Sequence, residues 1–546
     1  MSGTTVFVAK KIVTMHPSNP EATHVAVRDG RILGAGTLDE VSVWGECALD
    51  ETFRDHVLLP GLIEAHAHDA GLPFPYAGRF DRKEVDGSTT RGLDGIPALL
   101  SRLRELDASM DEPGAPIVVW GFDPIYYDGD RLNAKHLDEA CPERPVLVMH
   151  ASFHVATVNS AMLRKHDITR EAGVEGVVRG ADGEPNGELQ EMPAMALARS
   201  GTFAILRQTG SERMIRDYGL AARNQGITTT ADLGGSAFID PSSSERWQRV
   251  VNDPSFPARI VQYNLPSMPG TPADYDAIAE RLLELRQTAT DKLRFPGIKL
   301  ILDGSIQGYT AVLNEPYYLK EGNGIWMIAP EEIPRAVAAF HRRYINVHAH
   351  CNGDATVDAF VDAVDLALRE TPWPDHRHTV QHSQLTSAAQ YRRMAKLGMC
   401  ANIFTNHIWY WGDQHYELTV GPERAMRMEA CATAKREGVR FSMHSDASVT
   451  PLGQLHTMWC AVNRVTPKGR VLGEHEKISA YDALHACTID AAYQLHLDHE
   501  IGSIEAGKRA DFAVLEASPL DVEPMAIKGI AVWGTVLGGK KHAAAG

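Results

Sequence analysis

Two histidines stand two residues apart where an apolar run ends. His66 and His68 close the segment LLPGLIEAHAH, residues 58–68. Side chains alternate along a β-strand, so both imidazoles point to the same side. Two imidazoles placed in this way can bind one metal ion. The HxH pair alone is a weak signal, because such pairs also serve in packing, in capping or in solvent.

Four more side chains of types that can bind metal follow at the ends of later apolar runs. They are Lys299, His350, His382 and Asp446. Each has an ordinary alternative, such as a buried ion pair for the lysine, a core position for a histidine, or a helix N-cap for the aspartate. Their recurrence in register favours a shared site instead. His348, two residues before His350, competes with it for the same position.

The elements that must position these residues are eight short apolar runs. They alternate with amphipathic stretches of helical period, which is the pattern of parallel strands buried on both faces and joined by helices. The sequence therefore predicts an α/β fold, a (β/α)₈ TIM-type barrel with its site at the C-terminal strand ends. The runs span residues 58–68, 226–234, 258–265, 297–305, 345–354, 378–384, 398–406 and 440–448.

Both ends of the chain are rich in short β-type runs separated by turn residues. We expect residues 1–57 and 500–546 to form one β-sandwich domain, with a metal-dependent barrel over 58–499. The interval 71–225 after the first barrel strand is too long for a single loop, so it predicts an insertion domain within the barrel.

The composition excludes several classes of partner. The chain has 54 basic and 70 acidic residues, a net charge of −16, which disfavours nucleic acid or an anionic membrane. It has no signal-peptide core and no apolar run of about 18 residues, so a cytoplasmic location without membrane partners is expected. Seven scattered cysteines without CxxC pairs argue against a disulfide framework.

Several segments carry a resemblance to a known family. PGLIEAHAH is similar to a first-strand motif PGxxDxHxH, with Glu64 in place of the usual Asp. GIKLILDGS, HCNGD, VQHSQ and SDASV resemble GVKxxxDGS, HAxGD, IEHAQ and SDxPV, and GSIEAGKRADFAVLE resembles a closing GSLxxGKxADxxVL. These motifs are those of the amidohydrolase superfamily, in its amidohydrolase-3 or YtcJ-like branch, and the likeness runs nearly end to end.

The resemblance implies a metal centre of one or two zinc ions per chain. By that likeness His66, His68, Lys299 and Asp446 surround an inner ion, and Lys299, His350 and His382 an outer one. HCNGD favours His350 over His348. Because a protonated amine repels a cation, Lys299 would act as a ligand after carboxylation to a bridging carbamate. Ligand types alone leave the number of ions open, and also the choice between zinc, manganese and iron.

The same resemblance implies an enzyme, a metal-dependent amidohydrolase acting on a small-molecule amide. Metal ions would activate a hydroxide at neutral pH, with Asp446 as general base and then general acid. We expect cleavage of a C–N bond in an N-acyl or N-formyl amine. The alternatives are a heterocycle deaminase or cyclic-amide hydrolase of the same superfamily, and a binding or regulatory protein on a barrel scaffold. Lys299 speaks against a deaminase, and the complete ligand set against a binding protein.

Further residues are candidates for contact with the substrate. His154, in a segment that departs from the family's DGHxxxxNS, is a candidate to polarise the substrate from the insertion. An aromatic loop after the seventh strand predicts an apolar pocket, but it would also suit packing against the insertion or a second subunit. A homodimer is the assembly expected if the chain self-associates, as large barrels often do. The predicted substrate-binding residues are Gln307, Tyr309, His407, Trp409 and Trp411.

Overall fold

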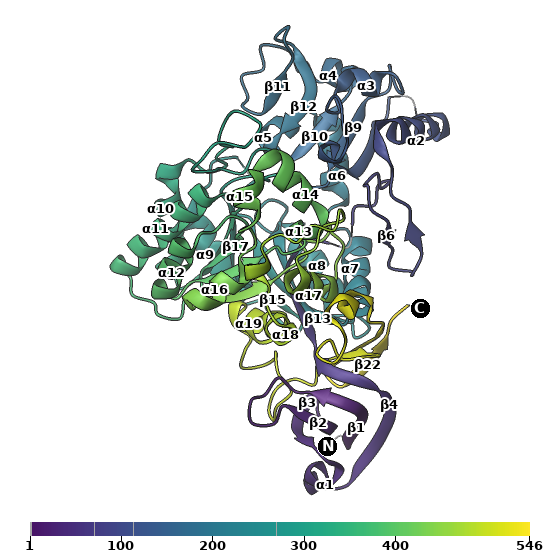
Figure 1. The fold of residues 1–546 in the computed structure, drawn as a ribbon, viewed down its shortest axis with the longest axis vertical. Coiled ribbons are helices and arrows are strands. Elements are labelled where there is room, and N and C mark those ends of the chain that lie inside the picture. The colour runs from purple at the N-terminus through teal and green to yellow at the C-terminus, as the bar shows by residue number, and fades with distance from the viewer. Residues whose placement is uncertain (1–2, 70, 113, 269, 546) are drawn as a thin grey trace.

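Eight parallel strands form a nearly closed barrel in a computed structural model, which describes residues 3–69, 71–112, 114–268 and 270–545 (Figure 1). Strand neighbours follow chain order from β5 to β19. Each of the eight predicted runs contributes one strand, which confirms the predicted barrel. The strands are β5 (Leu62–Ala67), β13 (Ile227–Gly235), β14 (Arg259–Asn264), β15 (Leu293–Ile301), β16 (Asn346–Cys351), β17 (Thr379–His382), β18 (Cys400–Ile403) and β19 (Arg440–Met443).

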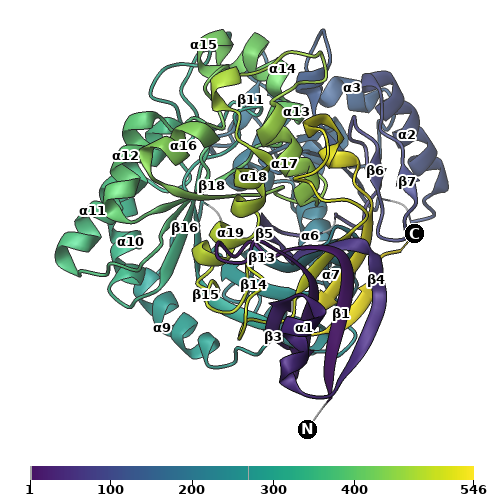
Figure 2. The same cartoon turned by 60° about the horizontal axis from the view of Figure 1, so that its bottom comes forward.

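Helices cover the outside of the barrel, as Figure 2 shows from a second direction. Alternate residues of β16, Val347 and Ala349, join the core shared with α10 and α11. The residues between them, His348 and His350, therefore face the barrel interior. The covering helices include α7 (Glu212–Asn224), α8 (Ser242–Val251), α9 (Tyr275–Arg286), α10 (Ile333–His341), α11 (Asp354–Glu370), α12 (Ala388–Leu397), α16 (Cys431–Glu437), α17 (Gln454–Asn463), α18 (Ala480–Ala486) and α19 (Ile489–Gln494).

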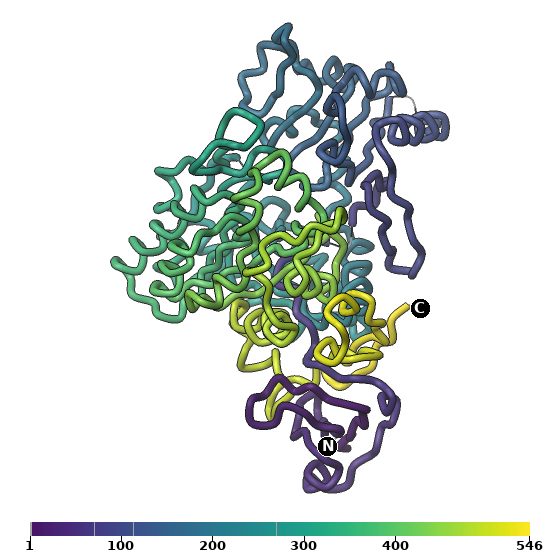
Figure 3. Tube along the Cα trace, viewed as in Figure 1, coloured from purple at the N-terminus to yellow at the C-terminus, as the bar shows by residue number. Residues whose placement is uncertain are grey.

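Both termini build one mixed sheet below the barrel, as predicted for the two chain ends. The tube in Figure 3 brings the purple and yellow segments together there. The strand order is β22-β21-β20-β4-β1-β2-β3, with β4 parallel to β1 and antiparallel to β20. The strands are β1 (Thr4–Val13), β2 (Glu21–Arg28), β3 (Arg31–Gly36), β4 (Cys47–Pro60), β20 (Phe512–Leu515), β21 (Val532–Leu537) and β22 (Lys540–Ala543).

A single residue links the N-terminal part of this sheet to the first barrel strand. Gly61 separates β4 from β5, and its backbone N–H donates to Asp511 O at 2.9 Å. A Cβ at Gly61 would overlap the side chain of Thr228 in β13. The chain can pass this closely only because the residue is glycine.

The segment between β5 and β13 has a sheet and a core of its own. Its five strands follow the order β11-β12-β10-β9-β8, and Leu147, Ala156 and Leu189 are among its buried residues. α7, near the end of this segment, packs against the barrel strand β13 instead. The elements are β8 (Ile117–Phe122), β9 (Val146–His150), β10 (Val155–Val158), β11 (Val177–Arg179) and β12 (Pro185–Gln190), with α2 (Gly95–Ser109), α5 (Glu191–Met195) and α6 (Arg199–Gln208).

The described ranges were also searched for helices that could cross a membrane. No helix among them combines the length and the apolar character that crossing a bilayer requires.

Candidate metal and substrate site

The six residues predicted as metal ligands gather at the C-terminal ends of the barrel strands. His66 lies in β5, Lys299 in β15 and His350 in β16, and His382 is the last residue of β17. His68 and Asp446 follow directly after β5 and β19. All six line one cavity of about 310 Å³, as expected for residues at strand ends of a barrel.

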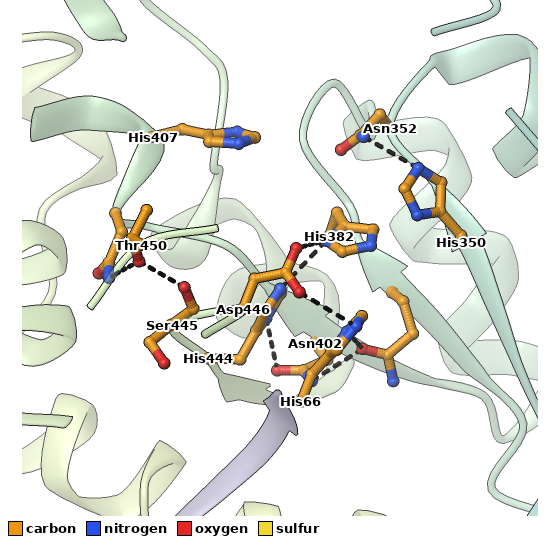
Figure 4. Close-up of polar contacts among 12 residues, drawn as sticks. His66, His350, Asn352, His382, Asn402, His407, His444, Ser445, Asp446 and Thr450 are labelled. Carbon is orange, nitrogen blue, oxygen red and sulfur yellow. Dashed lines mark hydrogen bonds and ion pairs between the residues drawn. The ribbon is translucent and has the colours of Figure 1, made fainter. Parts of the chain in front are cut away.

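Asp446 is the centre of this group. Its Oδ1 lies 3.4 Å from Nε2 of His66 and 3.3 Å from Nε2 of His68. Its Oδ2 lies 3.6 Å from Nδ1 of His382, and Figure 4 shows the carboxylate turned toward both His66 and His382. Lys299 Nζ is 3.3 Å from His66 Nε2, so the lysine reaches the same point. The rings of His350 and His382 are 4.2 Å apart.

These donors fit a divalent cation. Two sets of side chains each bring three ligand atoms within 4.8 Å of one another, His66 with His68 and Asp446, and His66 with His382 and His444. Asp446 Oδ1 and His382 Nε2 are buried and have no hydrogen-bond partner among the described residues. Buried polar atoms are rarely left unsatisfied, and a bound cation would satisfy both.

The protonation states also suit a metal site. Burial, with a smaller effect of the Lys299 charge, holds the pKa of His66 well below its usual range. Burial likewise holds the pKa of His382 well below its usual range. Both imidazoles are therefore neutral at neutral pH, which is the form that binds metal.

Lys299 differs from an ordinary lysine. Burial lowers its pKa to about 7, although Asp446 acts in the opposite direction. A large fraction of the amine is therefore neutral at neutral pH. Only a neutral amine can react with CO₂ to form a carbamate, so the pocket favours the chemistry that ligation by Lys299 requires.

His350 and His348 occupy different levels of the barrel. His348 lies deeper, where its ring stacks on Tyr263 at 3.9 Å between centroids and its Nδ1 accepts from Gln381 Nε2 at 2.8 Å. His350 lines the cavity. Its Nε2 lies 3.2 Å from Gly304 O and 3.1 Å from Asn352 Nδ2. Both contacts fall on Nε2, so Nδ1 is the ring nitrogen that they leave for a ligand.

Two supporting residues were missed in the sequence. Gln381 Oε1 lies 2.7 Å from His66 Nδ1, and accepting that N–H would leave His66 Nε2 unprotonated toward the cavity. His444 Nε2 is 3.1 Å from His382 Nδ1, beneath the carboxylate of Asp446. The spacing of His444 and Asp446, two residues apart after a strand, repeats the signal that singled out His66 and His68. The sequence offers no comparable signal for Gln381.

Backbone strain collects at the same place. His382 and Asp446 both adopt left-handed conformations, with φ of 67° and 53°. Neither is glycine, and such conformations cost about 1–3 kcal/mol each. The packing around the strand ends holds both side chains in place despite that cost.

A second pair of polar residues reaches the cavity from the insertion. His154 Nδ1 is 2.8 Å from Glu191 Oε2, and the ring of His154 is 4.9 Å from that of His350. Burial lowers the pKa of His154, but the carboxylates of Glu191, Asp303 and Asp446 together outweigh burial and the net pKa is raised. Glu191 is a left-handed residue with φ of 65°. No sequence pattern singles out Glu191, because it meets His154 only through the fold of the insertion.

Comparison with known proteins gives the family. A model described as the amidohydrolase family matches residues 54–541. The chain belongs to the amidohydrolase family. The predicted likeness to its YtcJ branch is confirmed by a relative in Bacillus subtilis, the putative amidohydrolase YtcJ, which is 23% identical over 97% of each chain.

Two more relatives of this amidohydrolase span nearly its whole length. The protein LONG AFTER FAR-RED 3 of Arabidopsis thaliana is 26% identical over 97% of this chain and 90% of its own. An N-substituted formamide deformylase of Arthrobacter pascens is 25% identical over 94% of both. Among solved structures, an uncharacterized metal-dependent hydrolase of Pyrococcus horikoshii covers 96% of this chain and 99% of its own, with a TM-score of 0.69 and 19% identity, which supports the fold.

The residues predicted to bind substrate do not line this cavity of the amidohydrolase. None of Gln307, Tyr309, His407, Trp409 and Trp411, all within the described ranges, is among the residues that line the cavity. Trp411 Nε1 donates to Asp123 Oδ2 at 3.0 Å, and the ring of Trp411 packs with Ile125 of the insertion. Trp409 packs edge-on against Trp459, and His407 Nδ1 is 3.2 Å from Glu429 Oε1. Trp411 thus makes the contact with the insertion that was the alternative interpretation of this loop, whereas Trp409 and His407 contact residues outside the insertion.

Gln307 and Tyr309 lie in the loop after β15. Gln307 is buried, and its Oε1 has no hydrogen-bond partner among the described residues. Tyr309 is half-buried, with its ring 5.2 Å from that of Tyr317 and with Lys320 Nζ 4.6 Å from its centroid. Apolar side chains of the insertion and of the βα loops form much of the cavity wall instead.

Proposed function

We propose that this amidohydrolase hydrolyses a linear amide, an N-acyl or N-formyl amine, to a carboxylic acid and an amine. The observation that carries the proposal is the convergence of six predicted ligands on one cavity around Asp446 Oδ1, which has no hydrogen bond within the described part of the chain. The relative named as an N-substituted formamide deformylase supports this choice of substrate.

The metal would be held by the six residues named in the sequence, and we propose zinc, with Lys299 carboxylated. When bound, divalent zinc lowers the pKa of water and polarises a carbonyl group. The six residues are His66, His68, Lys299, His350, His382 and Asp446.

Asp446 is the proposed proton carrier. Burial alone would raise its pKa, but its contact with His68 and the charges of His444 and Lys299 hold the pKa below the ordinary value. Asp446 is therefore ionised at neutral pH and able to accept the proton of the attacking water. Delivery of that proton to the amide nitrogen would let the amine leave as the C–N bond breaks.

His154 is the proposed second catalytic residue. Its Nδ1 is engaged by Glu191, so Nε2 is the atom that can donate to the substrate carbonyl oxygen. Glu191 acts through His154, as a positioning residue that fixes the orientation and charge of the ring.

The test pairs metal analysis with hydrolysis assays. Protein purified without chelator is analysed for zinc, manganese and iron, and is assayed on N-acyl and N-formyl aromatic amines. Two zinc ions per chain with amine release support the complete proposal. One ion with amine release supports a mononuclear hydrolase without the lysine bridge. Protein that holds no metal and cannot be reconstituted, or that has metal but releases no amine from any amide, contradicts the proposal.

A further inference from the structure

The cavity wall carries a group of flexible apolar side chains that the proposed chemistry does not use. Six methionines line it, and we call this wall the methionine lobe. Three come from the insertion, one from α7, and two from loops after barrel strands. They are Met149, Met192, Met195, Met214, Met268 and Met327.

The lobe reaches the surface beside α6. Ile205 is buried and lines the cavity, and its neighbour Leu206 lines the cavity while 38% exposed. Leu206 therefore marks the rim, where the cavity opens between α6 and the loop after β13. Phe203, on the same helix, is 54% exposed and does not line the cavity.

The methionine lobe offers no positive charge to an anionic group at the end of a substrate chain. Lys299 is the single lysine or arginine among the lining residues in the described ranges, and it belongs to the metal group. Four carboxylates face the same space, those of Asp69, Glu191, Asp232 and Asp446. A carboxylate or phosphate placed against the methionine lobe, away from the metal group and His154, would have no counter-charge, and burial of an unpaired ion is strongly unfavourable.

The volume of the cavity and the flexibility of its methionine side chains indicate which ligands it can hold. About 310 Å³ is at the lower end of the range for small-molecule pockets. Methionine side chains are unbranched and polarisable, so they adapt to apolar groups of different shape. A wall of this kind favours a flexible chain over one fixed ring.

We propose that the methionine lobe selects electrically neutral amides that carry a flexible aliphatic chain, which lies along α6 while the amide group faces the metal residues. The inference rests on the proposed amide hydrolysis and adds the substrate class. The aliphatic chain belongs to either the acyl or the amine half of the substrate, and in both cases it presents the same apolar surface to the lobe.

Binding measurements test the lobe apart from turnover. The Asp446→Asn variant, loaded with zinc, is titrated by calorimetry with N-butyl-, N-hexyl- and N-octylformamide. A second series carries the same chains on the acyl side of an N-methylamide. In the series that matches the bound orientation, affinity should rise about threefold to fourfold per methylene until the lobe is filled. An analogue with a terminal carboxylate should bind at least about tenfold more weakly.

Two substitutions test where the aliphatic chain of the ligand binds. Ile205→Trp fills the lobe and Leu206→Trp narrows its rim, so each should weaken octyl binding more than butyl binding, by about tenfold or more. Phe203→Trp, on the exposed side of the same helix, is the matched control and should leave the chain-length dependence unchanged. Circular dichroism and the Tm show whether each variant is folded. If the Ile205→Trp variant does not fold, the Leu206→Trp variant at the rim still tests the proposal.

The outcomes separate the two proposals. Three results would each overturn the lobe assignment. They are equal affinity for butyl and octyl chains in both series, undiminished affinity for the carboxylate analogue, and an unchanged preference for octyl over butyl in the folded tryptophan variants at positions 205 and 206. Chain-dependent binding that the tryptophan variants abolish, with no hydrolysis by the zinc-loaded wild type, supports the lobe and contradicts the proposed reaction.

Discussion

His154 Nδ1 lies 2.8 Å from Glu191 Oε2 inside the cavity that is also lined by the six predicted metal ligands. The two side chains come from the insertion, whereas the metal group comes from the barrel. The cavity therefore lies between two separate sheets, and the proposed chemistry requires residues from both.

Glu191→Gln removes the charge that favours protonated His154 while keeping the size of the side chain. We expect kcat to fall about tenfold to a hundredfold with a small change in KM, because the donor acts mainly as charge develops on the carbonyl oxygen. Steady-state kinetics measures this. Glu184→Gln should behave as wild type, because this glutamate of the same insertion has a side chain that is 46% exposed and pairs with Arg170 outside the cavity. A Glu191→Gln variant with wild-type kcat shows that the pair has no catalytic role.

Asp446→Asn replaces the proposed proton carrier with a group of the same shape. Turnover should fall by about a hundredfold to ten-thousandfold, in line with loss of general acid–base catalysis. The Tm and most of the bound metal should remain. Full activity in a folded, metal-loaded variant would sink the assignment of Asp446.

Removal of metal by a chelator should abolish hydrolysis and lower the Tm by a few degrees, because a ligand that binds only the native state stabilises it. Zinc added back should restore both. Differential scanning calorimetry records the shift. His66→Ala loses a shared ligand, so its Tm should no longer respond to chelator. An equal response in that variant points to a metal bound elsewhere.

Acid should destabilise the protein through a histidine at the far end of the barrel strands. Burial lowers the pKa of His376 to about 4, against 6.5 for an ordinary histidine. Above pH 6.5 the ring is neutral in both states. As the pH falls from 6.5 to 4 the unfolded chain takes up the proton first, so about 3 kcal/mol of stability is lost.

Urea unfolding at several pH values measures this slope. His376→Gln should lose stability less steeply over the same interval, whereas His475→Gln, at an exposed position, should match the wild type. A slope that is equal in wild type and His376→Gln contradicts the role of this group.

Trp411→Phe separates packing from substrate contact. It removes the indole N–H that Asp123 accepts at 3.0 Å and leaves a buried carboxylate oxygen unsatisfied. The free energy of unfolding should fall by about 1–3 kcal/mol. KM should not change, because Trp411 does not line the cavity. A raised KM with an unchanged free energy of unfolding would indicate that Trp411 contacts the substrate.

The strands could be predicted from local patterns in the sequence, and the six predicted ligands that line one cavity could be chosen from those strand ends together with the family resemblance. A strand such as β16 shows its alternation directly, and its histidines follow from that alternation. Contacts between distant segments were not readable. Glu191 reaches His154 through the left-handed turn at the end of β12, and Gln381 reaches His66 across the barrel. Trp411 shows the limit most clearly, because an aromatic side chain signals burial without indicating which surface covers it.

The position of β4 has a consequence for synthesis. This strand pairs with β1 on one side and with β20 on the other, and it runs through Gly61 into the strand that holds His66. One edge of β4 thus stays open until residues beyond 511 have left the ribosome. His66 and His68, the first predicted metal ligands to be translated, therefore follow a strand that gains its second partner only when β20 has been made.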